Sequence, residues 1–342
     1  METTTIKPAE ILAAAPDAIA IRLGATPSHP HPLAKNLTAR QIAYAIGAKL
    51  RKPVEIEAEL SIVARGMHSA EFAGLLSKGG QHVTVSAFDA AAQEHLQFTA
   101  TTIVEGFLAE NTPALDGDLD LQPLLNEFSE IARGAAFTAV GGVAVQLSTH
   151  ARIVVVSRQL VINDQLGALK NIFGAVGAHA AQKEAAIIAA TLNGNPTMED
   201  GAAMFSDSNT VKATLDGANL GAAMGMLRNQ KSAAGNALNL RAAHLVVSPE
   251  LEYAARKTAL EGGLDVKVAA LAGLPAARWF VLPDPAIHPV LTVLRLAAAR
   301  HPLRLEHKAP MEFDGTAIRV TADLGAAFLR RTGIVRAGSD LA

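Results

Sequence analysis

The sequence predicts an α+β subunit organised around one long helix, and three observations support this. A segment without proline, residues 164–192, carries apolar or small residues at helical spacing and follows Asn163-Asp164, a good helix cap. Strand and helix patterns alternate over residues 206–309, and a turn-rich, β-leaning stretch covers 110–150. At about 1.5 Å per residue the helix would be roughly 43 Å long. We therefore expect an elongated subunit.

The composition excludes several classes of protein. Half of the 342 residues are hydrophobic, but only 4% are aromatic, and the charged share of 18% is below the roughly 25% of typical globular proteins. Either other copies cover much of the surface, or the source genome is rich in alanine codons. The net charge of −2 does not favour strong binding to phosphate backbones. The absence of cysteine excludes disulfides and thiolate chemistry.

For the N-terminal third of the chain, the sequence predicts an extended arm followed by helices. The first 18 residues lack the basic region and apolar core of a secretory signal, and no apolar run approaches the roughly 20 residues of a membrane span. Thr38 is a candidate cap, and we expect Gly79-Gly80 to end a helix. The expected elements are a short helix at 8–15, a proline-rich loop at 28–32, helices at 38–50 and 69–77, and a helical segment within 87–106.

The sequence predicts a long irregular segment, residues 110–150, before the long helix. Residues 110–150 are either a mobile loop or a projecting β-hairpin. We expect residues 153–156 to form a buried strand, since they are an apolar β-branched run. The long helix should end at Asn193-Gly194-Asn195-Pro196, because proline cannot continue it.

The C-terminal half predicts a small α/β layer and a terminal hairpin. Pro249 suits the first turn of a helix, where its missing N–H has no partner. The expected elements are helices at 218–230 and 249–260, strands at 244–247 and 279–282, an apolar run at 290–296, and a hairpin with one strand at 311–313, a turn at 314–315 and alternating residues 316, 318 and 320.

The motifs of common enzymes are absent. The chain has no G-x-G-x-x-G after a strand, no P-loop, no H-E-x-x-H and no G-x-S-x-G. His29 and His31 lie in a proline loop without carboxylates, which is a poor metal site. His179, near Lys183, is interpreted as a surface or interface histidine. We assign no catalytic, cofactor-binding or metal residue, although a dispersed Ser-His-Asp set is left open.

Two short patterns have structural interpretations. Gly217, Gly221 and Gly225 form a G-x-x-x-G-x-x-x-G stripe, which in a helix of a soluble protein favours close packing over ligand binding. Asp207-Ser208-Asn209 suits a turn. Neither pattern predicts a reaction.

Several segments together resemble the Mu-like major capsid proteins of tailed phages. The main match is SRQLVINDQLGAL (157–169), then a long helix, then LNGNPTMEDGAAMF (192–205). Matches also occur, in the family's order, at 67–80 (MHSAEFAGLLSKGG), 219–257, 277–286 and 314–335. The resemblance covers roughly residues 67–335. In many relatives the shell domain follows a prohead protease.

The resemblance implies an HK97-like fold with an N-arm, an extended E-loop, a peripheral P-domain and an α/β axial A-domain. The implied parts are an N-terminal arm at 1–66, N-terminal helices at 67–109, the E-loop at 110–152, the P-domain at 153–205 and 310–342 with its spine helix at about 164–192, and the A-domain at 206–309. No protease sequence precedes the shell domain. We therefore expect any maturation protease or scaffold to be a separate chain.

The resemblance also implies a function and partners. The expected function is a non-enzymatic structural protein, without cofactors, forming the hexamers and pentamers of an icosahedral head around double-stranded DNA. The virion belongs to the tailed phages (Caudoviricetes), with assembly in the bacterial cytoplasm alongside a portal, a scaffold or protease, and decoration proteins. An encapsulin-type compartment and a soluble α/β enzyme are the alternatives. Because no lysine lies between Lys78 and Lys170, we expect no covalent cross-link through an E-loop lysine.

Overall fold

The computed structural model divides the chain into two compact units. The first unit comprises Met1–Ala92, Thr149–Gln182 and His301–Asp323, and the second comprises Gln93–Ser148, Lys183–Arg300 and Leu324–Ala342. The structure describes residues 7–24, 27, 29–50, 62–63, 65–66, 69–91, 93–108, 114–116, 138–140, 146–157, 159, 163, 166–198, 200–232, 235–299, 301–308 and 315–341.

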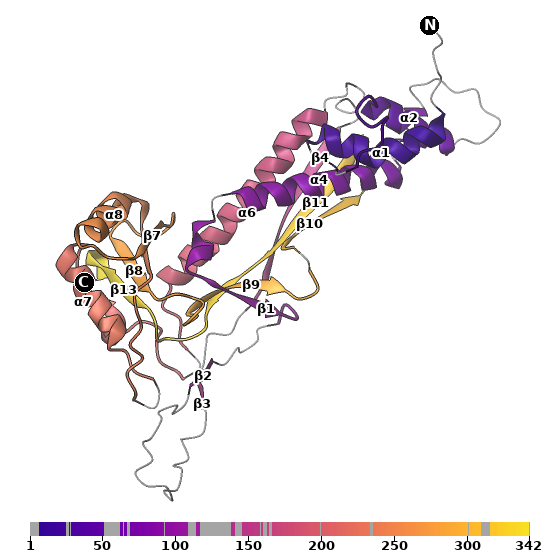
Figure 1. Ribbon diagram of the computed structural model, residues 1–342. Helices are drawn as coiled ribbons and strands as arrows, with labels where there is room; N and C mark the ends of the chain where they lie inside the picture. The colour runs from indigo at the N-terminus through magenta and orange to yellow at the C-terminus, as the bar shows by residue number, and fades with distance from the viewer. Residues whose placement is uncertain are drawn as a thin grey trace, which may run out of the picture. The chain divides into compact units, whose positions relative to one another are not determined.

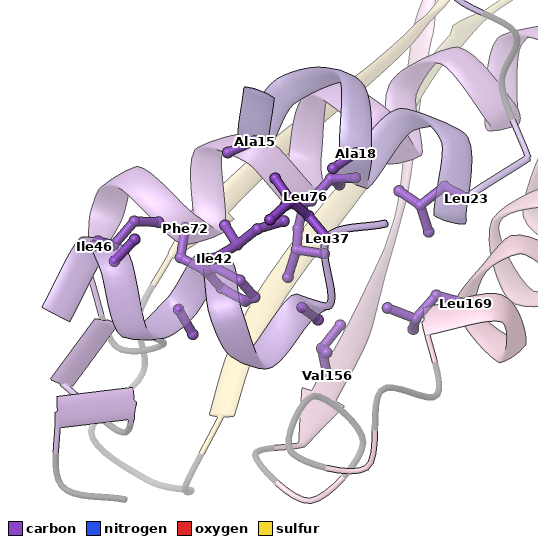
Figure 2. Packing of buried hydrophobic residues seen from close by; sticks show 14 of the residues in the cluster. Ala15, Ala18, Leu23, Leu37, Ile42, Ile46, Phe72, Leu76, Val156 and Leu169 are labelled. Atoms are coloured by element: carbon purple, nitrogen blue, oxygen red, sulfur yellow. The ribbon is translucent and has the colours of Figure 1, made fainter. Parts of the chain in front are cut away.

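The first unit packs helices against one face of a three-stranded sheet with the order β10-β11-β4 (Figure 1). Its elements are α1 (Pro8–Arg22), α2 (Ala39–Lys49), α4 (Ala70–Ala90), most of β4 (Ser148–Ser157), the first part of α6 (Leu166–Asn193), β10 (Leu303–Lys308) and most of β11 (Gly315–Leu324). Figure 2 shows side chains of α1, α2, α4 and α6 meeting Val156 of β4 in one core. Ile318 and Val320 of β11 belong to the same cluster.

Helix α2 starts where the sequence predicts. The Thr38 hydroxyl accepts a hydrogen bond from the Gln41 N–H, and the Gln41 side chain accepts one from the Thr38 N–H. This reciprocal capping box satisfies two backbone donors that the first turn of a helix leaves unpaired.

Two expected helix ends in this unit are wrong. Helix α4 continues through Gly79-Gly80, because these glycines let neighbours come close rather than end the helix. A Cβ on Gly79 would lie 2.6 Å from Leu23 Cδ1, and one on Gly80 would lie 2.9 Å from Phe173 Cζ. Helix α1 likewise continues past Pro16 to Arg22. Burial of Ala18 and Ile19 stabilises the turn that lacks the proline N–H.

Two strand predictions also need correction. The run 153–156 is only half buried: Val154 and Val156 face the core, whereas Ile153 and Val155 are exposed on the other face of β4. The terminal hairpin exists, but its first strand is β10 at Leu303–Lys308, with Leu305 opposite Val320. Residues 309–314, including the expected strand at 311–313, lie outside the described residues.

The second unit contains the α/β layer. Its five-stranded sheet has the order β5-β13-β8-β6-β7 and mixes parallel and antiparallel pairs. The strands are β5 (Thr210–Val211), β6 (His244–Val247), β7 (Lys267–Ala270), β8 (Arg278–Leu282) and β13 (Val335–Gly338). The helices are η2 (Asp207–Asn209), α7 (Gly217–Arg228), η3 (Pro249–Leu251), α8 (Glu252–Glu261) and η4 (Ser339–Leu341).

Both faces of this sheet are buried. Helices α7 and α8 pack on one face with Trp279 and Val281, and the C-terminal end of α6 packs on the other with Val246 and Phe280. Continuous burial explains why β6 and β8 are unbroken apolar runs rather than alternating ones. The predicted strands and helices of this layer are confirmed within a few residues.

The second unit also contains a smaller sheet. Its order is β1-β9-β12, formed by β1 (Ala100–Val104), β9 (Leu291–Leu296) and β12 (Ala326–Phe328). The helical segment expected within 87–106 is therefore wrong beyond Ala90, since η1 (Glu94–Gln97) and β1 follow. β2 (Ala114–Asp116) pairs antiparallel with β3 (Thr138–Val140). Of the two predictions for residues 110–150, a mobile loop or a projecting β-hairpin, this pairing agrees with the hairpin. Residues 117–137 lie outside the described part.

The long helix is confirmed. Helix α6 runs for 28 residues, Leu166–Asn193, and at about 1.5 Å per residue it spans roughly 42 Å. It ends at the predicted Asn193-Gly194, and the expected cap Asp164 lies outside the described residues.

Candidate functional site

The residues that the sequence singles out do not come together. His31 accepts a hydrogen bond at Nδ1 from the Leu33 N–H (3.3 Å) within its own loop. His179 is exposed on α6 beside Gln182, with 3.0 Å between Nδ1 and Oε1. Asp207, Ser208 and Asn209 form the short helix η2, as the turn interpretation predicts. Among the residues that the structure describes, no group of three or more His, Cys, Asp and Glu side chains could hold a metal ion.

The glycine stripe of α7 does not pack closely within the chain. A Cβ placed on Gly217, Gly221 or Gly225 would meet no described residue outside the helix's own backbone within 4 Å. The close-packing interpretation is therefore wrong for contacts within one copy.

The helices were also compared with the length and hydrophobicity that a membrane span requires. Within the described ranges, the structure has no helix that is both long enough and apolar enough to cross a membrane.

Sequence reasoning missed a buried ion-pair cluster in the second unit. Glu184 lies on α6, His95 on η1 and Arg295 on β9, and the side chains of both His95 and Glu184 are only 1% exposed. Arg295 pairs with both carboxylate oxygens of Glu184, through Nη1 to Oε1 and through Nη2 to Oε2 (3.1 Å). His95 Nε2 lies 3.2 Å from Glu184 Oε2. The cluster joins three segments that are far apart in the sequence.

The cluster has a structural rather than a catalytic character. Burial opposes ionisation of Glu184, but the hydrogen bonds from His95 and Arg295, together with their charges, outweigh it and lower the pKa of the carboxyl below its usual value. Both oxygens are therefore occupied by donors and shielded from solvent, so the carboxylate is not available as a base. The signal in the sequence was Lys183-Glu184, which interrupts the apolar pattern of the helix. Its partners could not be identified without the tertiary fold.

Exposed apolar side chains are the other notable surface feature. In the second unit, Ile103, Phe107 and Leu108 are exposed in and just after β1. Tyr253 and Leu260 are exposed seven residues apart on α8, which places them on one face of that helix. Large apolar side chains exposed in groups are typical of protein–protein contact surfaces. The arrangement therefore suits contacts with other protein chains better than a small-molecule reaction.

Comparisons with known proteins agree with such a role. A family model described as phage capsid protein matches residues 142–337, more than half of the chain. No curated protein sequence gives a significant match.

Solved structures show weak likeness. The capsid of Cyanophage P-SCSP1u is 11% identical, with a TM-score of 0.47, over 72% of this chain and 88% of that one. The holo-SrpI encapsulin complex from Synechococcus elongatus PCC 7942 is 10% identical, with a TM-score of 0.48, over 73% and 88%. The capsid of a native GTA particle is 12% identical, with a TM-score of 0.49, over 72% and 90%.

Proposed function

This chain belongs to the phage capsid protein family, and from that premise we propose that it is the major capsid protein of a tailed phage, forming hexamers and pentamers of an icosahedral head. The observation that carries the proposal is the family match across residues 142–337. The exposed apolar side chains of β1 and α8 support it, because a shell subunit buries such groups against its neighbours.

We further propose that the parts of the chain have the roles of an HK97-like subunit. Strands β5 to β8 with α7 and α8 support an A-domain within 206–309, and β13 (Val335–Gly338) from the C-terminal segment completes the same sheet. The pairing of β2 with β3 is evidence for an E-loop at 110–152. The length of helix α6 is evidence that it is the spine helix of a P-domain formed by 153–205 and 310–342. Residues 1–66 act as an N-terminal arm or extension, whose helices α1 and α2 pack in the core of the first unit, and 67–109 connect it to the P-domain.

The proposed partners follow from this role. The particle encloses double-stranded DNA without sequence specificity, which is compatible with a net charge of −2 because the DNA is confined rather than tightly bound. A portal, a separate scaffold or protease, and decoration proteins complete the head. The subunit itself catalyses no reaction, and the head assembles in the bacterial cytoplasm before it becomes part of the virion.

The test is particle formation. The chain is expressed alone and together with its neighbouring genes, and the products are examined by negative-stain electron microscopy. The proposal expects closed shells, with DNA packaged when the neighbouring genes are present. A persistent monomer with a measurable turnover would support the enzyme alternative. Shells that enclose a co-expressed enzyme and never DNA would support the encapsulin alternative.

A further inference from the structure

Strand β1 is an edge strand of the small sheet β1-β9-β12. It pairs in parallel with β9 over Ala100–Val104. Over the ranges that the structure describes, no strand pairs with the other side of β1. Thr101 and Ile103 are both exposed, and Ile103 is 69% exposed. An edge of this kind presents unpaired N–H and C=O groups to any strand that can approach it.

The backbone groups that point outward can be assigned from the register of β1 with β9. The Ala297 N–H donates to the Val104 carbonyl (2.9 Å), so the backbone groups of Val104 face β9. Alternate residues along a strand direct their N–H and C=O groups to the same side. The backbone groups of Thr102 therefore also face β9, whereas those of Thr101 and Ile103 point away from it.

Strand β1 lacks the features that usually protect an edge strand. Natural edge strands tend to carry a charge, a proline or a bulge that prevents pairing with another chain. The sequence of β1 is ATTIV, without a charged residue or proline, and its register with β9 contains no bulge. Its β-branched residues favour an extended backbone. Neither the charge nor the backbone of β1 therefore prevents pairing with a further strand.

We propose that β1 of one copy pairs antiparallel with β1 of a second copy about a two-fold axis, with Thr102 opposite Thr102 of the second copy. In this register, Thr101 of each copy lies opposite Ile103 of the other. Each such pair can exchange both N–H···O=C bonds, because Thr101 and Ile103 direct their backbone groups outward. The contact rests on the proposed self-assembly, which it deepens by naming the strand through which two copies meet.

The residues of β1 favour a second copy of the same strand as the occupant. A two-fold contact uses the same patch on both copies, so the patch must be complementary to itself. Like charges directly opposite each other destabilise a strand pair, and Ala100–Val104 contains no charge that could meet its own copy. On the exposed face, the pairing places Thr101 beside Ile103 of the other copy, and β-branched side chains of this kind pack well on a pleated surface.

The segments on either side of β1 carry further exposed apolar side chains. Leu96 is exposed in η1, before the strand, and Phe107 and Leu108 are exposed after it. Antiparallel pairing brings the end of one strand to the start of the other, so Phe107 and Leu108 of one copy approach Leu96 of the second copy. The contact therefore removes from water, at both of its ends, apolar groups that a single copy leaves exposed.

A single engineered cysteine tests this register, because the chain has no cysteine of its own. Residues opposite each other in a non-hydrogen-bonded antiparallel pair have Cα atoms about 4.5 Å apart, within the roughly 4.4–6.8 Å that a disulfide spans. Oxidised particles of Thr102→Cys should therefore give covalent dimers on a non-reducing denaturing gel, and reduction should remove them. No higher multiples are expected, because each chain carries one cysteine.

The matched control is Ile103→Cys. Ile103 is more exposed than Thr102, but the two copies of Ile103 lie two residues out of register, roughly 7–8 Å apart, and should give little dimer. Particles of Thr102→Cys without a dimer band, or equal dimer bands from both variants, would overturn the contact while leaving the proposed function intact. If the unsubstituted chain forms no particles, the proposed function fails and the contact with it.

A proline at position 103 provides a second measurement that needs no disulfide. Ile103→Pro removes an N–H that points away from β9, and edge strands tolerate proline where the N–H faces solvent. The circular dichroism of the unassembled chain should therefore stay unchanged, whereas particles should be lost because this N–H can no longer donate across the contact. Ile103→Val keeps the N–H and should assemble. Particles of Ile103→Pro at the unsubstituted yield, or loss of particles in Ile103→Val as well, would overturn the contact.

Discussion

Gly177 on α6 offers the sharpest test of the packing in the first unit. A Cβ on Gly177 would overlap the carbonyl oxygen of Thr84 on α4 and lie 3.0 Å from the Ala87 Cβ. Gly174 lies one turn earlier on the same helix, and a Cβ there would meet no atom within 4 Å. The two glycines therefore differ in tertiary contact and not in secondary structure.

The magnitude follows from comparing alanine at the two positions. Replacing glycine with alanine inside a helix stabilises it by about 0.5–1 kcal/mol, because glycine loses more backbone entropy on folding. Gly174→Ala should show this gain. In Gly177→Ala the overlap with a backbone atom forces α4 and α6 apart, at an overpacking cost of about 1–3 kcal/mol. Because the entropy gain is common to both variants, their difference in unfolding free energy isolates the overpacking cost.

The assay is urea unfolding of the unassembled chain, followed by circular dichroism for both variants. We expect Gly174→Ala to unfold at a higher urea midpoint than the unsubstituted chain, and Gly177→Ala at a lower one. Equal midpoints for the two variants would refute the close approach of α4 and α6 at Thr84.

Three further predictions concern the buried ion pair, the long helix and cross-linking. Ala181→Pro removes a hydrogen bond inside α6 and should cost about 3 kcal/mol or more; assembly with unchanged yield would contradict the helix placement. Arg295→Met leaves Glu184 buried without its charged partner and should cost about 3–5 kcal/mol at neutral pH, measured by urea unfolding. Since pairing lowers the pKa of Glu184, its contribution is present above the unfolded pKa and is lost as the pH falls through the lower folded pKa, so this deficit should shrink in acid. A deficit independent of pH would count against the pairing. Finally, unsubstituted particles should run as single chains on a denaturing gel, because no lysine lies between Lys78 and Lys170; a covalent ladder would contradict this.

Much of the secondary structure was predictable, because it depends on local signals. The capping box at Thr38, the stop at Asn193-Gly194 and the apolar strand β6 are each encoded within a few residues. The failures occurred where tertiary contacts override such signals. Gly79-Gly80 was expected to end a helix, yet Leu23 and Phe173 pack against that position and the helix continues.

The functional surfaces were less predictable. The capsid family could be recognised from the order of motifs, and the family model that matches residues 142–337 agrees with it. The cluster of His95, Glu184 and Arg295 could not, since its members are separated by 89 and 111 residues. The neighbours of β9 in its sheet could not be predicted either, because the alternation of residues along one strand does not specify which strands pair with it.

The sequence by itself determined the long helix, the α/β layer and the family, because periodicity, caps and motif order are properties of the chain alone. The tertiary structure decided which glycines mark close contacts and which carboxylate is buried. These depend on residues far apart in the chain meeting in space: Gly177 contacts Thr84 and Glu184 pairs with Arg295, whereas a Cβ on Gly217, Gly221 or Gly225 of α7 would meet none of the described residues within 4 Å.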